Sequence, residues 1–565
     1  MDMTEFNKQL FKDSSLEDRY DLSKNEVLLN GTQALIRFLL IQKQRDLKAG
    51  LNTAGYVSGY RGAPLGNLDF LLGREKSRLD QSDIVFNPGL NEDIAATALW
   101  GSQQAELRGE GKFDGVYGLW YGKGPGVDRS GDVLRHANMA GTSRYGGVLM
   151  ALGDDHTGES STTLHQSDMA LLDAYMPIFS PAGVQEVLDY GVYGIALSRF
   201  SGNWVGLKCM KETIESTAVV DGNPFRIDYE IPNFEIPDSG LNIRIWDTPG
   251  EREARILDYR RYAAEAFAYQ NNINHRVAGK PGAKIGIAAA GKNWFDLIHA
   301  LSLLGLDDQE LERLGITTYK IGLTWPLDQK GMLEWAEGLD TIIVVEEKRK
   351  LIEAQIKELL FNQRKSYQVF GHRDHKGEIL FTAKYGLSPI QVAIGIGEVL
   401  GYKELQTEKL LANLQILKDS TREENAPDIL KRSPYFCSGC PHNTSTKIPE
   451  GSRAYAGIGC HYMVQWMDRE TLGFTHMGGE GANWIGEAPF STTSHIFQNM
   501  GDGTYNHSGI QTIRAAVISG VNMTYKILYN DAVAMTGGQL NDGDLTPQQV
   551  IRTCCYRCRQ GCRRI

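Results

Sequence analysis

The chain has 565 residues, which is too long for one hydrophobic core and predicts roughly three or four domains. It is 42% hydrophobic and 23% charged, as globular proteins are, and its net charge of −10 argues against a nucleic-acid-binding surface. It contains no apolar run of about 18 residues, so we expect no transmembrane helix and no membrane association. The N-terminal stretch "MDMTEFNKQLFKDSS" lacks the apolar core of a signal peptide, and we therefore expect a cytoplasmic protein.

The N-terminal half alternates between helix-like and strand-like stretches. Residues 1–25 are polar and predict an extended arm. The stretch "GTQALIRFLLIQKQRDLKAG" predicts an amphipathic helix with Thr32 as its cap and Gly50 at its end. Three strand-like stretches then run into glycine-rich loops: "LNTAGYVSGY", "FDGVYGLWYGKGPG" and "YGGVLMALGDDHTG". Their loops should gather at the carboxyl ends of parallel strands, where α/β sheets bind ligands.

Changes in composition along the chain predict its domain boundaries. The stretches "KIGIAAAG" and "DTIIVVEEK" indicate strands of a second α/β domain, and "LKDSTREENAPDILKRSP" indicates a linker before a third. We therefore expect an N-terminal arm (1–25), a first α/β domain (26–230), a connecting segment (231–282), a second α/β domain (283–416), a linker (417–434), a third α/β domain (435–552) and a Cys/Arg-rich tail (553–565).

In the third domain, Asp502 stands between Gly501 and Gly503. After Gly503, 26 residues with a helix-like and then a strand-like pattern lead to Asn530. That spacing suits one helical crossover to a neighbouring parallel strand, which would place Asp502 and Asn530 side by side. With the backbone carbonyl of Ala532 they offer three oxygen ligands, and magnesium takes its remaining ligands from phosphates and water. The alternative is a pair of ordinary turns.

The surroundings of Asn530 favour the metal–diphosphate interpretation. The "MTGGQ" stretch that follows, with Met535 and Thr536, completes a pattern that resembles the thiamine-diphosphate motif. The loop "HMGGEG", with Gly478 and Gly479, is a second place where backbone could approach a ligand closely.

Thiamine diphosphate also needs a carboxylate that hydrogen-bonds its aminopyrimidine ring. The candidate is Glu92, in "PGLNEDIAATALWGSQQA", where it opens a small-residue helix. The alternative is that Glu92 only complements the positive end of the helix dipole.

Three cysteines precede the Asp502 motif. Cys437 and Cys440 form a Cys-x2-Cys pair, and Cys460 follows twenty residues later. In a cytoplasmic chain this pattern indicates metal or redox chemistry rather than disulfides. Three thiolates need a fourth ligand, either for zinc or for a [4Fe–4S] cluster. We favour the cluster, because a carbanion-forming cofactor can use a one-electron acceptor, and a zinc knuckle remains the alternative.

These motifs resemble the 2-oxoacid:ferredoxin oxidoreductase superfamily, and within it the indolepyruvate ferredoxin oxidoreductase family, in its alpha-type chain of the long fused bacterial form. The resemblance covers residues 15–550, and the stretches that carry it include "NPGLNEDIAATALWGSQQ", "GDDHTGESSTTLHQSD", "CSGCPHNTST" and "GDGTYNHSGI…NDAVAMTGGQ". It implies an α/β multidomain thiamine-diphosphate-binding fold. Residues 26–230 would form a pyrimidine-binding-type domain, 283–416 a transketolase C-terminal-like domain, and 435–552 an incomplete diphosphate-binding domain.

The resemblance also implies a reaction, in which an arylpyruvate, coenzyme A and oxidised ferredoxin give an arylacetyl-CoA, carbon dioxide and reduced ferredoxin. It implies Glu92 as the activating carboxylate and a homodimer, or a complex with a second chain, as the assembly. Magnesium would be bound by Asp502, Asn530 and the Ala532 carbonyl, and the cluster by Cys437, Cys440 and Cys460.

A glycine loop with Ser58 and Arg61 would face the substrate, and Arg61 would pair with its carboxylate. Lys123 is a further cation in a matching loop, and the alternative for both cations is an ordinary surface charge. Spacing does not decide which 2-oxoacid is bound.

The chain departs from the family in length and in its last residues. Fused members are about twice as long, and the ending "TCCYRCRQGCRRI" is unlike theirs. We interpret this ending as the product of a reading-frame shift, which would leave the cluster without its fourth ligand. Two alternatives to the oxidoreductase therefore stay open: a non-oxidative thiamine-dependent decarboxylase, and a truncated, inactive cofactor-binding subunit.

Overall fold

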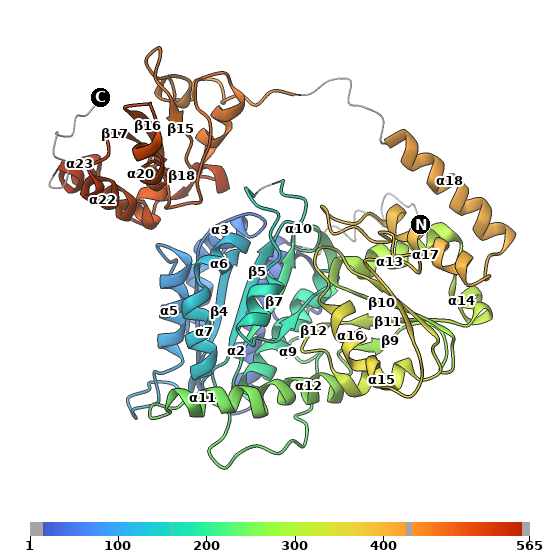
Figure 1. The fold of residues 1–565 in the computed structure, drawn as a ribbon. Helices are drawn as coiled ribbons and strands as arrows, with labels where there is room; N and C mark the ends of the chain where they lie inside the picture. Colours follow the sequence, from blue (N-terminus) through green and yellow to red (C-terminus); the bar gives the residue numbers. More distant parts are fainter. Residues whose placement is uncertain (1–14, 160, 425–431, 556–565) are drawn as a thin grey trace, which may run out of the picture. The chain divides into compact units, whose positions relative to one another are not determined.

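The computed structural model describes residues 15–159, 161–424 and 432–555, which fold into two compact units (Figure 1). The first unit contains residues 15–87 and 92–424 of this range, and the second contains residues 88–91 and 432–555. Both are built on parallel sheets with flanking helices, which confirms the predicted α/β multidomain class.

A seven-stranded sheet is the centre of the first unit. Its strand order is β12-β6-β7-β5-β4-β2-β3, and each neighbouring pair is parallel except β12 with β6. Parallel strands are joined by crossover helices that bury both faces of a sheet, so the central strands are continuous apolar runs. The strands are β2 (Thr53–Gly59), β3 (Ile84–Phe86), β4 (Gly115–Lys123), β5 (Val148–Asp154), β6 (Ile178–Phe179), β7 (Trp204–Met210) and β12 (Leu323–Trp325).

Helices cover both faces of this sheet. One hydrophobic core lies against α2, α9 and α12 and contains Phe38 and Phe267, and the opposite core contains Trp120 and Trp204 under α5 and α7. The helices are α2 (Gly31–Lys48), α3 (Gly66–Arg74), α4 (Lys76–Gln81), α5 (Glu92–Ser102), α6 (Gly124–Arg129), α7 (Gly131–Ala140), α8 (Asp168–Asp173), α9 (Val184–Ser201) and α10 (Lys211–Ile214). Beside them β1 (Glu26–Asn30) pairs antiparallel with β8 (Thr217–Asp221).

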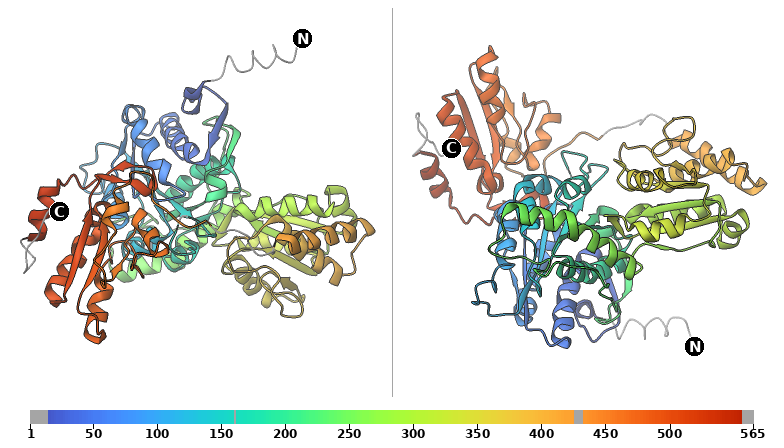
Figure 2. Two further views of the ribbon diagram at one scale, coloured as in Figure 1. Left: turned by 90° about the horizontal axis from the view of Figure 1, so that it is seen from above. Right: turned by 60° about the horizontal axis from the view of Figure 1, so that its bottom comes forward.

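A five-stranded sheet forms the second lobe of the first unit, coloured green to orange in Figure 2. Its order is β14-β13-β10-β11-β9, and only β9 is antiparallel to its neighbour. Its strands are β9 (His275–Arg276), β10 (Ile285–Ala290), β11 (Ile316–Ile321), β13 (Thr341–Val345) and β14 (Gln368–Phe370). Its helices are α13 (Gly291–Leu304), α14 (Asp308–Leu314), α15 (Gln329–Ala336), α16 (Ile352–Phe361), α17 (Pro389–Tyr402) and α18 (Glu408–Glu424). In sequence β12 belongs to this lobe, yet it pairs with β6, so the two lobes share a sheet edge.

The predicted connecting segment contains a long helical stretch that runs below the strands of the seven-stranded sheet in the view of Figure 1. It consists of α11 (Pro249–Arg255), the π-helical turn η2 (Ile256–Arg260) and α12 (Arg261–Gln270). The guanidinium of Arg260 is fully buried, and it donates hydrogen bonds to the carbonyl oxygens of Leu241 and Asn138. Burial with these hydrogen bonds attaches the segment to the first lobe.

The described part of the predicted N-terminal arm is not extended. Residues Leu16–Arg19 form the 3-10 helix η1, and the segment after it is held from inside by Arg37, which is fully buried. The acceptors of the Arg37 guanidinium are the carbonyl oxygens of Asp18, Arg19, Asp21, Lys24 and Gly222. A buried guanidinium needs acceptors for its donors, and this requirement folds the segment onto the core. Residues 1–14 lie outside the described residues.

The first predicted helix is confirmed as α2, but its cap is Asn30 rather than Thr32. The Asn30 side chain accepts from the Gln33 backbone N–H (2.8 Å), and the Gln33 side chain accepts from the Asn30 N–H (2.9 Å). This reciprocal pair satisfies two N–H groups at the start of the helix. The helix ends just before Gly50, whose φ of 76° is left-handed.

The second unit is built on three parallel strands in the order β15-β16-β17. They are β15 (Ala454–Tyr455), β16 (Ile496–Gly501) and β17 (Met523–Leu528), and α22 (Ile510–Ser519) crosses from β16 to β17 as predicted. Its other elements are α19 (His442–Ser445), η3 (Cys460–Trp466), α20 (Ala482–Glu487), η4 (Ala488–Phe490), α21 (Asp502–Thr504), the π-helical turn η5 (Tyr505–Gly509), β18 (Ala532–Val533), η6 (Ala534–Thr536), β19 (Gln539–Leu540) and α23 (Pro547–Cys555).

Two predicted irregular segments are partly helical. Residues 417–424, expected in the linker, belong to α18, because Leu410, Leu414 and Leu417 of that helix are buried in the core of the five-stranded lobe. The helix α23 extends into the predicted Cys/Arg-rich tail as far as Cys555. Residues 425–431 and 556–565 lie outside the described residues.

Among the residues that the structure describes, no helix combines the length and apolar character that crossing a bilayer requires.

Candidate functional site

The strands of the second unit end next to one another. Gly501, the last residue of β16, is in register with Leu528, the last residue of β17. Asp502 therefore follows one strand directly, and Asn530 lies two residues beyond its parallel neighbour. The prediction that Asp502 and Asn530 lie side by side at the carboxyl edge of the sheet is confirmed.

The carboxylate of Asp502 is buried and faces the loop after β17. Its Oδ2 atom accepts hydrogen bonds from the backbone N–H groups of Asn530 (3.2 Å) and Asp531 (2.7 Å), and its Oδ1 atom accepts from Gly503 (3.0 Å). The Oδ1 atom of Asn530 accepts from the Ala532 N–H (3.3 Å). A carboxylate and an amide oxygen at adjoining strand ends are hard donors, so this donor set fits a magnesium ion with phosphate as its further ligand.

The glycine loop before α20 is held by a carboxylate that sequence reasoning did not single out. Glu480 is fully buried and accepts hydrogen bonds from the backbone N–H groups of Gly478 (2.6 Å) and Ile458 (3.2 Å). Burial raises the pKa of Glu480 to about 7, and these hydrogen bonds oppose the rise. Gly478 has a φ of 88°, and a Cβ on Gly479 would lie 2.5 Å from the His476 ring. Both predicted glycines thus stand where a side chain would be strained or would clash.

Met535 and Thr536 lie in η6, on the loop that follows Asn530. The Thr536 hydroxyl donates to the Gln539 side chain (2.8 Å), which stabilises the turn into β19, and the Met535 side chain is 53% exposed. Both residues thus belong to the stretch that directly follows Asn530 and Asp531 in the chain.

His461 is a second residue that the sequence analysis did not select. It follows Cys460 at the start of η3 and is 2% exposed. The Gly457 N–H donates to its Nδ1 atom (3.3 Å), and its ring lies 5.8 Å from the ring of His442, centroid to centroid. Burial lowers the pKa of His461 to about 3, and the positive charges of His442 and Lys526 lower it further.

The three predicted cluster cysteines lie within electrostatic reach of one another. Cys437 and Cys440 are joined by a turn in which the Cys440 N–H donates to the Cys437 carbonyl (3.0 Å). Burial raises the pKa of Cys460, and the neighbouring thiols of Cys440 and Cys437 raise it further. Within the described ranges, however, no three His, Cys, Asp or Glu side chains form a group that could bind one metal ion.

In the first unit, Glu92 opens α5 and is 6% exposed. Its backbone carbonyl accepts a hydrogen bond from the indole N–H of Trp120 (3.1 Å) in β4. Gly126 of α6 packs over its side chain so closely that a Cβ there would lie 2.7 Å from Glu92 Oε1. The strand β4 and the helix α6 together fix the position of this carboxylate.

One predicted cation, Lys123, lies near Glu92. Lys123, the last residue of β4, packs over Gly62, and a Cβ on Gly62 would lie 2.6 Å from Lys123 Cδ. Burial lowers the pKa of Lys123, while the charges of Asp155 and Glu92 oppose the shift. Lys123 and Glu92 are therefore electrostatic neighbours at the carboxyl end of β4.

Arg61 is 4% exposed and forms an ion pair with Asp69 (3.3 Å), which excludes the surface-charge alternative for it. Ser58 is also buried, inside β2 and opposite Trp120. The loop after β2 thus reaches the end of β4 through Gly62, while Ser58 stays within the sheet.

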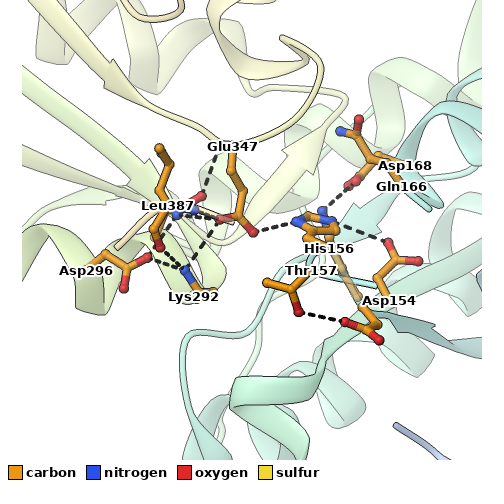
Figure 3. Close-up of polar contacts among 12 residues, drawn as sticks. Asp154, His156, Thr157, Gln166, Asp168, Lys292, Asp296, Glu347 and Leu387 are labelled. Atoms are coloured by element: carbon orange, nitrogen blue, oxygen red, sulfur yellow. Dashed lines mark hydrogen bonds and ion pairs between the residues drawn. The ribbon is translucent and has the colours of Figure 1, made fainter. Parts of the chain in front are cut away.

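A buried polar cluster joins the two lobes of the first unit (Figure 3). His156, two residues beyond β5, forms a hydrogen bond with Glu347, two residues beyond β13. Glu347 also accepts from the Leu387 N–H (2.8 Å) and lies 3.4 Å from Lys292 Nζ, which pairs with Asp296 (2.7 Å). A cavity of about 40 Å³ adjoins the pair. Because 191 residues separate the partners, no local pattern signals the cluster.

Two family models match the chain. The "Indolepyruvate oxidoreductase domain" matches residues 275–424, and the "Thiamine pyrophosphate enzyme, C-terminal TPP binding domain" matches residues 457–553. The second match spans Asp502, Asn530 and the glycine loop of the second unit.

Curated relatives cover most of the chain at low identity. "Indolepyruvate oxidoreductase subunit IorA" of Methanothermobacter marburgensis is 22% identical over 519 residues, 90% of this chain and 77% of the relative. The protein of the same name from Pyrococcus horikoshii is 22% identical over 553 residues, 93% of this chain and 77% of the relative.

A solved structure of 2-oxoglutarate:ferredoxin oxidoreductase from Magnetococcus marinus, with 2-oxoglutarate, coenzyme A and succinyl-CoA bound, matches with a TM-score of 0.49 at 14% identity. The match covers 68% of this chain and 66% of that one.

Proposed function

Because the chain is a distant, IorA-like member of the 2-oxoacid:ferredoxin oxidoreductase family, we propose that it binds thiamine diphosphate and magnesium and decarboxylates an aryl 2-oxoacid of the indolepyruvate type. Coenzyme A accepts the acyl group, and an iron–sulfur cluster passes the electrons to ferredoxin. The observation that carries the proposal is the pair Asp502 and Asn530 at adjoining strand ends, inside the segment matched by the thiamine pyrophosphate model.

The second unit supplies the residues for the diphosphate end of the cofactor. Asp502, Asn530 and the Ala532 carbonyl would hold magnesium, and the backbone at Gly501, Gly503, Gly478 and Gly479 would bind the phosphates. Met535 and Thr536 would border the same site. When bound, thiamine diphosphate would supply an acidic ring carbon for addition to the 2-oxoacid and a positively charged ring that accepts the electron pair left by decarboxylation.

Glu92 is our candidate for the carboxylate that hydrogen-bonds the aminopyrimidine ring. Its burial and its fixed position under Gly126 favour this role over simple dipole complementarity, because a carboxylate that only complements a helix end has no need of such enclosure. Lys123, at the end of β4, would provide positive charge for an anionic substrate, and Arg61, after the neighbouring strand β2, would have to share its charge between the substrate and Asp69.

We prefer a cluster to a zinc knuckle because oxidation of a 2-oxoacid to an acyl-CoA releases electrons that need an acceptor, which zinc cannot supply. Each thiolate of a [4Fe–4S] cube binds a different iron, so its cysteines stand farther apart than four ligands around one zinc ion. Burial and the charges of Cys440 and Cys437 raise the pKa of Cys460, so the three cysteines lie close enough to one another to be candidate ligands of one cluster. The relatives are named as subunits, which supports a second chain as partner.

Anaerobic reconstitution with iron, sulfide, magnesium and thiamine diphosphate tests the proposal. We expect coenzyme A-dependent reduction of an added acceptor such as methyl viologen, with indolepyruvate, phenylpyruvate and a branched-chain 2-oxoacid compared as substrates. Release of carbon dioxide and an aldehyde without acceptor reduction would instead identify a non-oxidative decarboxylase. Cofactor binding with no turnover on any substrate would identify a cofactor-binding subunit.

A further inference from the structure

His461 is held in one orientation at the carboxyl end of β15. The backbone N–H of Gly457 donates to its Nδ1 atom (3.3 Å), so Nδ1 offers a lone pair and the ring proton of the neutral imidazole lies on Nε2. The ring is 2% exposed. His461 is therefore a fixed, buried N–H donor.

Among the described residues, the Nε2 atom of His461 has no hydrogen-bond partner. Buried donors in folded proteins are nearly always paired, so an unpaired one indicates a missing ligand or water. Two buried carboxylates of this unit already accept other hydrogen bonds. The carboxylate of Asp502 accepts from the N–H groups of Asn530 and Asp531, and Glu480 accepts from those of Ile458 and Gly478.

The Nε2 atom points into space that two glycines leave open. A Cβ on Gly459 would lie 3.1 Å from Nε2, and a Cβ on Gly501 would lie 3.5 Å from it. Gly501 immediately precedes Asp502 at the end of β16. The donor thus lies close to the strand edge where Asp502 and Asn530 stand.

The chemistry of the site selects the class of group that would pair with it. A metal ion cannot bind an N–H nitrogen, and moving the proton to Nδ1 would break the hydrogen bond from Gly457. An apolar group would leave the donor unpaired. An anionic oxygen satisfies it with a charge-assisted hydrogen bond, and phosphate oxygens are strong acceptors.

We propose that His461 Nε2 donates a hydrogen bond to a phosphate oxygen of the diphosphate that Asp502 and Asn530 hold through magnesium. This inference rests on the proposed function, since it assumes that a diphosphate binds there. His461 adjoins Cys460, so one short turn of chain carries both a candidate cluster ligand and a contact to the cofactor.

The experiment measures the affinity of the full chain for magnesium pyrophosphate and for magnesium thiamine diphosphate by isothermal titration calorimetry. We expect His461→Phe to weaken both by about tenfold, because a charge-assisted hydrogen bond is lost. His461→Gln, which keeps an N–H donor, should recover part of the loss. The matched control is His495→Phe, which makes the same substitution just before β16 begins, at the other end of the strand; its affinities should equal those of the unmodified chain.

Unchanged affinities in His461→Phe would overturn the inference about His461. If Asp502→Asn nevertheless lost binding in the same experiment, the proposed function would stand and only the role of His461 would be rejected. A scaffold role would also overturn it. That role predicts a lower unfolding temperature of the ligand-free His461→Phe protein together with no recovery in His461→Gln. If the unmodified chain bound neither pyrophosphate nor thiamine diphosphate, the proposed function would fail and this inference with it.

Discussion

The imidazole of His156 and the carboxylate of Glu347 form a buried pair whose members come from different sheets of the first unit (Figure 3). The side chains are 2% and 5% exposed. The pair therefore connects the carboxyl edges of the seven-stranded and five-stranded sheets where water has little access. At such a place a charge is tolerated only with its partner, because its hydration is lost.

Removing one member of this pair should destabilise the first unit strongly. We expect His156→Ala to lower the free energy of unfolding by about 3–5 kcal/mol, because it leaves the Glu347 carboxylate buried with less compensation. The double variant with Glu347→Ala should be less destabilised than the sum of the two single variants. Urea denaturation followed by circular dichroism measures all three. The control is Lys76→Ala, which breaks an exposed ion pair with Asp80 and should change the stability by less than about 1 kcal/mol. Strictly additive effects at His156 and Glu347 would contradict the coupling.

Stability should fall on both sides of an optimum at mildly acidic pH. Burial raises the pKa of Glu347, but the hydrogen bond and charge of His156 and the charge of Lys292 outweigh it and hold the pKa well below its usual value. A depressed carboxyl pKa stabilises the fold above the unfolded value near 4.5, and this contribution is lost as the pH falls. Stability at pH 3 should therefore be lower than at pH 6.

The expected loss of stability at alkaline pH depends on His165. Burial alone would lower the pKa of His165, but hydrogen bonds to Asp128 and Asp154 raise it to about 9. A raised histidine pKa stabilises the fold below about 6.5, and the contribution is lost as the pH rises towards 9. Urea midpoints at pH 6 and pH 9 measure the loss. His165→Gln should reduce the difference between the two pH values, and an unchanged difference would show that His165 is not its source.

Asp502→Asn should lower the magnesium-dependent affinity for thiamine diphosphate by about a hundredfold, since it removes the negative charge of a proposed metal ligand. The amide keeps the size of the side chain, so the fold should persist. Calorimetry with and without magnesium measures the effect. Asp531→Asn is the matched control, because Asp531 is exposed on the same loop and its φ of 56° suits asparagine equally well. Equal losses in the two variants would argue against a specific role for Asp502.

Glu92→Gln should leave cofactor binding intact and abolish the hydrogen–deuterium exchange at the thiazolium C2 position that proton NMR detects. Gly126→Ala should reduce the same exchange, because the added Cβ would stand 2.7 Å from Glu92 Oε1 and displace the carboxylate. Gly131→Ala is its control, since a Cβ there meets no atom within 4 Å. Normal exchange in Glu92→Gln would remove Glu92 from the reaction.

Local patterns in the sequence were sufficient to predict several helices and strands and the position of the Asp502–Asn530 site. Apolar runs followed by glycine loops located β2, β4 and β5, and the 26-residue spacing after Gly503 placed Asp502 beside Asn530, because both depend on short stretches of chain. Helix limits were less certain. Asn30 caps α2 through a side-chain pair with Gln33, and Thr32 offered an equally suitable residue type.

What the sequence did not predict depends on tertiary burial. The segment before Val27 is polar, yet it is folded because the guanidinium of Arg37, buried in α2, needs its carbonyl oxygens. His461 is an ordinary residue in a glycine-rich stretch until its burial and its bond from Gly457 are known. The pair of His156 and Glu347 joins positions that only the packing of two lobes brings together.

The shared edge of β12 with β6 and the polar cluster around Lys292 make the two lobes of the first unit mutually dependent. If the gene were divided at the start of the five-stranded lobe, each product would expose ionic groups whose partners lie on the other product. The N-terminal product would also lose β12 from the edge of its sheet. We therefore expect fragments expressed alone to be poorly folded, and co-expressed fragments to reassemble.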